Sequence, residues 1–186
     1  MKKISFPTDK RDWHPSLIPG PIALISTINE NGSTHAAPKS WIQMVSFEPP
    51  VLMFSGTKNN RTEKNILRSK SFGVNFVDSK MAGKVFECIK WYGEERIKNL
   101  NISFFKSEII DSPLIDECKA SLACKLSGTK AMGSGFVVFG EIVDAFISEM
   151  VALAQGEEKY KTLDQALYLE DGIYGIIGSI FKINAS

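Results

Sequence analysis

The chain has 186 residues, of which 44% are apolar, and it carries 22 lysines and arginines against 21 acidic residues. A chain of this length buries about 70% of its unfolded surface, so residues 1–186 are predicted to form a single domain without a disulfide or metal staple. The balanced charge argues against nucleic acid as a partner, because phosphate backbones bind to concentrated positive charge.

The sequence predicts neither a membrane span nor a secretory leader. No apolar stretch approaches the roughly 20 residues that cross a bilayer, and no apolar run follows the two lysines near the start. Cys88, Cys118 and Cys124 form an odd, widely spaced set, which indicates reduced thiols rather than disulfides or a zinc site. We therefore expect a cytoplasmic protein without a membrane partner.

The first half of the chain contains two predicted strand pairs. Residues 22–28 form an apolar, β-branched run that ends near Asn31 and Gly32. Asn-Gly favours a tight turn because both residues tolerate positive φ, so a hairpin into residues 34–37 is expected. Pro49 and Pro50 interrupt the chain, and residues 51–55 then have the composition of a buried strand.

Helical and strand patterns then alternate. A helix is predicted from Thr62 to Lys70, with the Thr62 hydroxyl as its cap. Residues 72–76 alternate as a strand does, and residues 81–100 are helical with a break near residues 92–93. Further strands are predicted at residues 122–126, 136–147 and 172–181. About seven strands without a βαβ rhythm indicate a mainly β fold, an antiparallel barrel with few helices.

The motifs of several enzyme classes are absent from the sequence. The two histidines, His14 and His35, do not have metalloprotease spacing, and no G-x-S-x-G, G-x-G-x-x-G or Walker motif occurs. We therefore predict no catalytic constellation and no metal site. His14 is expected to be structural, whereas for His35 a structural and a functional role both remain open.

The segment of residues 55–62 is the best candidate for binding an anion. It joins a buried strand to the first turn of a helix, where backbone N–H groups and the helix dipole favour a phosphate. Thr57, Arg61 and Thr62 add directed donors. A solvated connection before a capped helix would have the same composition, and this alternative stays open.

The order of several short motifs resembles the flavin reductase-like, FMN-binding split-barrel family, which includes the flavoredoxins. The resemblance runs from about residue 17 to residue 177. The matching segments are residues 19–27, 31–32, 37–41, 45–46, 49–50, 62, 65–66, 71–72, 74–75, 112–115, 122–124 and 140–143.

The resemblance implies a Greek-key split β-barrel with a few peripheral helices, an intimate homodimer, and one FMN per protomer near the dimer interface. It places one strand along the isoalloxazine ring and one loop around the phosphate. The residues implied along the ring are Ala37, Pro38, Lys39, Ser40 and Trp41; those implied at the phosphate are Ser55, Thr57, Arg61 and Thr62, with Asn65 steadying the loop and Arg96 near the cofactor.

The chain departs from the family pattern at three places. Asn60 and Arg61 stand where Lys-Asp is common, and His35 stands where many members have Asn. Ser134 and Gly135 replace an Asp-His pair, which removes an imidazole from the substrate side. Two further residues, Trp41 and Trp91, are expected either in the core or near the ring.

Three functions are compatible with these features. The first is an FMN-dependent oxidoreductase that takes hydride from NADH or NADPH and passes electrons to a small-molecule or protein acceptor. The second is a flavoredoxin-like electron carrier, and the third is a flavin-binding protein without turnover. FMN supplies its own redox chemistry, so the absence of a catalytic side-chain constellation agrees with all three.

Overall fold

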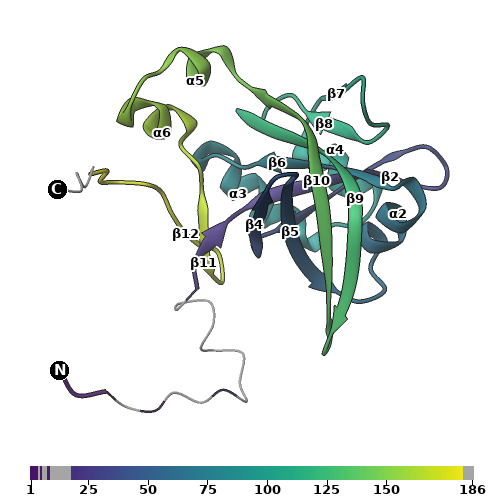
Figure 1. The fold of residues 1–186 in the computed structure, drawn as a ribbon, viewed down its shortest axis with the longest axis horizontal. Helices are drawn as coiled ribbons and strands as arrows, with labels where there is room; N and C mark the ends of the chain where they lie inside the picture. The colour runs from purple at the N-terminus through teal and green to yellow at the C-terminus, as the bar shows by residue number, and fades with distance from the viewer. Residues whose placement is uncertain (4, 6–7, 9–17, 182–186) are drawn as a thin grey trace.

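The computed structural model describes residues 1–3, 5, 8 and 18–181, and its centre is a seven-stranded sheet (Figure 1). All of its pairings are antiparallel, and the strand order is β3-β2-β6-β9-β10-β5-β4. The strands are β2 (Ala23–Ile28), β3 (Thr34–Lys39), β4 (Ile42–Phe47), β5 (Pro50–Thr57), β6 (Ser71–Phe76), β9 (Ala120–Met132) and β10 (Gly135–Ile147).

The two outer strands of this sheet, β3 and β4, are consecutive in the chain, and two residues, Ser40 and Trp41, connect them. The Ser55 N–H on β5 donates to the Trp41 carbonyl at 3.1 Å, which draws β5 against this connection. The sheet therefore curls into a barrel that is split between β3 and β5. The mainly β, Greek-key split barrel predicted above is confirmed.

Short elements surround the barrel. The helices are α2 (Arg61–Ser69), α3 (Ser79–Glu87), the 3-10 turn η2 (Cys88–Lys90), α4 (Glu94–Leu100), α5 (Glu149–Leu153) and α6 (Glu157–Leu163). The remaining strands are β1 (Gly20–Pro21), β7 (Phe104–Lys106), β8 (Pro113–Ile115), β11 (Leu167–Glu170) and β12 (Ile173–Gly175). Helices α5 and α6 follow β10 and extend away from the barrel (Figure 1).

Most of the predicted elements occur where the sequence placed them. The β2–β3 hairpin turns at Gly32, where φ is +82°, and the Asn29 N–H donates to the Ser33 carbonyl at 2.8 Å. The helical stretch of residues 81–100 breaks between α3 and α4, around the positive φ of Gly93. The strand expected over residues 172–181 is shorter than predicted, because only β12 pairs within it.

The predicted cap of α2 is wrong. Asn60, and not Thr62, caps the helix, since its Oδ1 accepts the Glu63 N–H at 2.8 Å. Thr62 instead lies inside the first turn and is buried. Both residue types cap helices well, and the extended backbone of Asn60 (φ −78°, ψ 166°) decides between them.

Strand β2 separates two apolar cores. Ala23 and Ile25 point into the barrel, where they pack with residues such as Phe72. Ile22 and Leu24 point to the other side, against a core formed largely by α3, α4 and η2. The apolar run of residues 22–28 is thus buried on both faces, and this chain's own helices cover much of the outer one.

Candidate functional site

Helix α2 lies against β2 and β3 at the split of the barrel. Ile66 packs into the barrel core, and the Asn65 amide donates to Thr27 Oγ1 and Asn29 Oδ1, both at 3.0 Å. Asn65 was predicted to steady residues 55–62; its hydrogen bonds instead tie α2 to β2 and the turn that follows it. The inner face of the helix is therefore fixed to the sheet.

The loop before α2 is held largely by its own side chains. The Asn60 amide donates to the Thr57 carbonyl, and the Asn59 N–H donates to Glu63 Oε2 at 2.6 Å. The Lys58 N–H donates to the Ser134 carbonyl at 3.4 Å, which links the loop to the β9–β10 turn. These bonds occupy several backbone N–H groups, so a ligand here would depend more on side-chain donors than the sequence suggested.

Three cations from three elements gather beside this loop. The Lys39 ammonium on β3 is 3.1 Å from the point that a Cβ on Gly56 would occupy. The Nη1 of Arg61 on α2 is 2.9 Å from the point that a Cβ on Gly93 would occupy. Arg96 on α4 is the third. Gly56 and Gly93 thus leave space that a larger residue would take from Lys39 and Arg61.

The Arg96 guanidinium is buried and bonded to carbonyls. Its Nε donates to Cys88 at 3.1 Å, and its Nη1 and Nη2 donate to Ala36 and Ile89, both at 3.4 Å. These bonds fix its position, but neutral carbonyls do not compensate a full charge. Among the described residues, no carboxylate forms an ion pair with Lys39, Arg61 or Arg96.

The cations act on a buried histidine between them. His35 Nε2 lies 3.1 Å from Thr62 Oγ1. Burial, together with the charges of Arg96, Arg61 and Lys39, lowers the pKa of His35 to about 4. Burial, followed by Arg96, also lowers the pKa of Lys39. Within the described residues, positive charge is therefore concentrated around His35 without an ion pair to a carboxylate, although Glu30 and Glu94 line a hollow with Arg61. A bound anion would complete this arrangement.

An apolar hollow of about 520 Å³ lies along β4, β5 and the β3–β4 connection, and none of the three cations is among its lining residues. Its walls include Ser40 and Trp41 after Lys39, and Ser55 before Gly56, so three of the predicted ring-side or phosphate-side residues line it. The remaining lining residues are Ile18, Pro19, Gly20, Pro21, Ile42, Gln43, Met53 and Val137. Trp41 is 53% exposed and Trp91 is 36% exposed, so the core placement considered for both is wrong.

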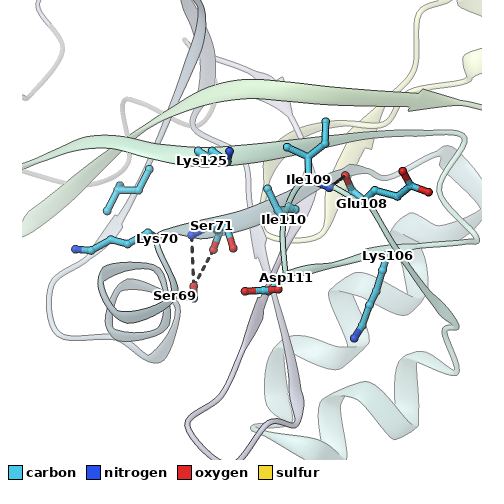
Figure 2. Close-up of a pocket in the computed structure, with 11 residues that line it drawn as sticks. Ser69, Lys70, Ser71, Lys106, Glu108, Ile109, Ile110, Asp111 and Lys125 are labelled. Carbon is cyan, nitrogen blue, oxygen red and sulfur yellow. Dashed lines mark hydrogen bonds between the residues drawn. The ribbon is translucent and has the colours of Figure 1, made fainter.

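Another hollow, of about 430 Å³, has a different charge balance (Figure 2). Lys70, Lys106 and Lys125 line it together with Glu108 and Asp111, so acidic groups accompany its cations. The Ser69 hydroxyl donates to the Ser71 carbonyl at 3.0 Å and accepts the Ser71 N–H at 3.5 Å. This hollow therefore differs from the surroundings of His35, where burial and three cations lower the pKa of the imidazole.

The structure gathers most of the predicted residues into one region. His35, Ala37 and Lys39 alternate along one face of β3, with Pro38 between them on the other face. The contact of His35 with Thr62 and the space that Gly93 leaves for Arg61 are not visible in the sequence. His14 lies outside the described residues. In the described part of the chain, no cluster of three or more His, Cys, Asp or Glu residues suits a metal.

The described residues thus form a cationic cluster around His35 and a separate apolar hollow along β4 and β5. A sequence model of the flavin reductase like domain matches residues 16–169. The chain therefore belongs to the flavin reductase like family, whose members take part in flavin-linked redox chemistry.

Individual relatives agree with this membership. An uncharacterised protein of Aquifex aeolicus is 33% identical over 162 residues, covering 79% of this chain and 80% of the relative. The reductase subunit HsaB of a flavin-dependent monooxygenase from Mycobacterium tuberculosis is 29% identical, covering 65% of this chain and 62% of HsaB. The crystal structure of flavoredoxin from Methanosarcina acetivorans is 27% identical with a TM-score of 0.83, covering 98% of this chain and 95% of that one.

Within the described residues, none of the helices has the length and apolar character that crossing a bilayer requires.

Proposed function

We propose that this protein binds FMN and works as a flavin reductase that takes hydride from NADH or NADPH. The observation that carries the proposal is the gathering of Lys39, Arg61 and Arg96 around His35 without an ion pair to a carboxylate in the described part of the chain. The apolar hollow is lined by Ser40 and Ser55, the chain neighbours of Lys39 and Gly56. FMN combines a doubly charged phosphate with a flat aromatic ring, so it matches both parts of this site.

Each part of the site has a distinct task. Arg61 and Lys39, together with the hydroxyls of Thr57 and Thr62, hold the phosphate, while Arg96 adds charge from its fixed position. The strand from Ala37 to Trp41 orients the ring, and the hollow excludes water from one of its faces. Bound FMN supplies the redox chemistry by accepting a hydride and later giving up two electrons to an acceptor. The protein therefore needs no catalytic acid, base or nucleophile.

A flavoredoxin-like electron carrier is the second candidate. Ser134 and Gly135 form part of the β9–β10 turn, which contacts the loop of residues 55–62. Many members of the family have a histidine at this turn. The missing imidazole weakens the case for a nicotinamide site, and the flavoredoxin relative supports the carrier role. The acceptor would then be a protein, whereas for a reductase it is a protein or a small molecule such as free flavin.

The dimer is part of the proposal. Strand β4 is an edge of the sheet and exposes Met44 (40%), Val45 (51%) and Phe47 (84%). Contiguous exposed apolar side chains on an edge strand favour association with another chain. Light scattering of the flavin-loaded protein should give twice the chain mass of 20.6 kDa, and Phe47→Glu should shift it towards the monomer. A wild-type monomer with full flavin occupancy contradicts this part.

Flavin titration and anaerobic stopped-flow test the main proposal. The protein should bind FMN more tightly than riboflavin or FAD, and NADH or NADPH should bleach the flavin absorbance, slowly and with a high apparent KM. Equal affinity for FMN and riboflavin would contradict the phosphate site. Bleaching by dithionite but by neither nicotinamide at millimolar concentration would replace the reductase by the electron carrier.

A further inference from the structure

His35 is a buried side chain to which the proposed function assigns no task. It lies on β3, and only 5% of its surface is exposed. Its Nε2 is 3.1 Å from Thr62 Oγ1, while its Nδ1 has no hydrogen-bond partner. A ring nitrogen that is both buried and unpartnered is uncommon, and its protonation state decides what the other nitrogen can do.

The unpartnered Nδ1 identifies the tautomer. A buried N–H without an acceptor is rarer and more costly than a buried lone pair without a donor. The neutral ring, expected at pH 7 because the pKa of His35 is lowered to about 4, therefore carries its proton on Nε2. Nε2–H then donates to Thr62 Oγ1.

The direction of this bond determines the role of Thr62. A hydroxyl that accepts from His35 keeps its own proton for another acceptor. Among the described residues, Thr62 Oγ1 makes no other side-chain hydrogen bond. The charged groups that act on the imidazole are Lys39 from β3, Arg61 from α2 and Arg96 from α4, all of them cations. An acceptor that completes this surrounding is an anion.

We propose that His35 is a positioning residue for phosphate recognition: it donates from Nε2 to Thr62 Oγ1, and so presents the Thr62 proton to the phosphate of the flavin. The inference rests on the proposed function, because it takes that phosphate as the anion. His35 acts only through Thr62, so it distinguishes FMN from riboflavin without touching either one.

The tautomer is measured directly in the wild-type protein loaded with FMN. The chain has two histidines, so a long-range ¹H–¹⁵N spectrum, compared with that of His35→Gln, assigns the nitrogens of His35. We expect a protonated Nε2 and a bare Nδ1. A proton on Nδ1 would overturn the proposal, because Thr62 would then be the donor to His35.

Flavin affinities test the role in recognition. His35→Phe, which fills the space but cannot donate, should weaken FMN binding about five-fold and leave riboflavin binding unchanged. His35→Gln, which keeps an N–H donor, should restore most of the FMN affinity. In the Thr62→Val background, His35→Phe should have no further effect on FMN, since its only route to the phosphate is gone.

The outcomes separate this proposal from the function on which it rests. If wild-type protein prefers FMN but His35→Phe weakens FMN and riboflavin equally, His35 only supports packing and the inference is wrong. The inference is also wrong if His35→Phe changes neither affinity. If the wild type binds FMN and riboflavin equally, the phosphate site itself fails, and the inference fails with it.

Discussion

The barrel buries two clusters of polar side chains that differ in how completely they are bonded. Around Asn75 on β6, the amide donates to the Leu24 carbonyl at 2.8 Å and to Ser26 Oγ at 2.9 Å. Its Oδ1 accepts the Ile115 N–H at 2.8 Å and the Ser121 hydroxyl at 3.0 Å. All four positions of the amide are used, and no charge is involved.

The cluster beside α2 is also partly buried, but within the described part of the chain not all of its hydrogen-bonding groups and charges have partners. His35 Nδ1 has no hydrogen-bond partner, and among the described residues no carboxylate forms an ion pair with Lys39, Arg61 or Arg96. Both clusters link elements that are far apart in sequence. The comparison shows that a fully bonded buried polar cluster has no capacity left for a ligand, whereas a cluster with an unpartnered nitrogen and several unpaired cations is a candidate binding site.

The largest effect is expected in the complete cluster. Asn75→Ala leaves a backbone carbonyl, a backbone N–H and two hydroxyls short of partners, so it should lower the free energy of unfolding by about 3 kcal/mol. Chemical denaturation measures this loss. Asn99→Ala, which removes an exposed amide on α4, is the control and should change stability little. A loss equal to that of the control would show that the Asn75 bonds carry no net stability.

The free energy of unfolding should depend on pH through His35 in the incomplete cluster beside α2. The pKa of His35 is about 4 in the folded chain, below the usual 6.5 of an unfolded one, so the unfolded state takes up a proton first. In flavin-free protein, stability should therefore fall as pH drops from 6.5 towards 4, by up to about 3 kcal/mol.

The matched measurement compares wild type with His35→Gln across that range. The difference in unfolding free energy between the two proteins should change with pH, because carboxylates titrate alike in both. The Asn75 cluster has no titratable group, so the loss in Asn75→Ala should stay constant. A pH-independent difference between wild type and His35→Gln would show that His35 titrates normally.

Loss of one cation should affect the ligand more than the fold. Arg61→Ala should weaken FMN binding by about 1.5–3 kcal/mol, the scale of a charge-assisted hydrogen bond. Riboflavin should lose less, and stability should change little because Arg61 has no acidic partner. Lys64→Ala, one turn further on the exposed side of α2, removes the same charge as a control. If fluorescence titration shows equal losses for both flavins, Arg61 does not bind the phosphate.

The thiols should have the smallest effect. Burial raises the pKa of Cys118 to about 12 and raises the pKa values of Cys88 and Cys124 in the same direction. Reactive thiolates therefore do not form near neutral pH. Replacing all three with alanine should leave flavin reduction within about two-fold of wild type, apart from a packing loss of about 1 kcal/mol at Cys124. Abolished reduction in folded, flavin-loaded protein would implicate a thiol.

The sequence predicts well what neighbouring residues decide. Asn31 and Gly32 define their turn locally, and the alternation of residues 72–76 is visible without tertiary context. The cap of α2 was missed because Asn60 and Thr62 are both good caps, and only the backbone path chooses between them. The resemblance identified Lys39, Arg61 and Arg96 individually. It did not show that these residues, from β3, α2 and α4, surround His35, because that arrangement depends on contacts between residues some 60 positions apart.

The position of β2 between two cores has a consequence for amide hydrogen exchange. Exchange of its N–H groups requires strand separation, and the barrel core holds Ala23 and Ile25 while the outer core holds Ile22 and Leu24. Opening of α3 and α4 alone exposes one face of β2 but leaves its hydrogen bonds to β3 and β6 intact. Its amides should therefore be among the last to take up deuterium, with protection that approaches the global unfolding free energy.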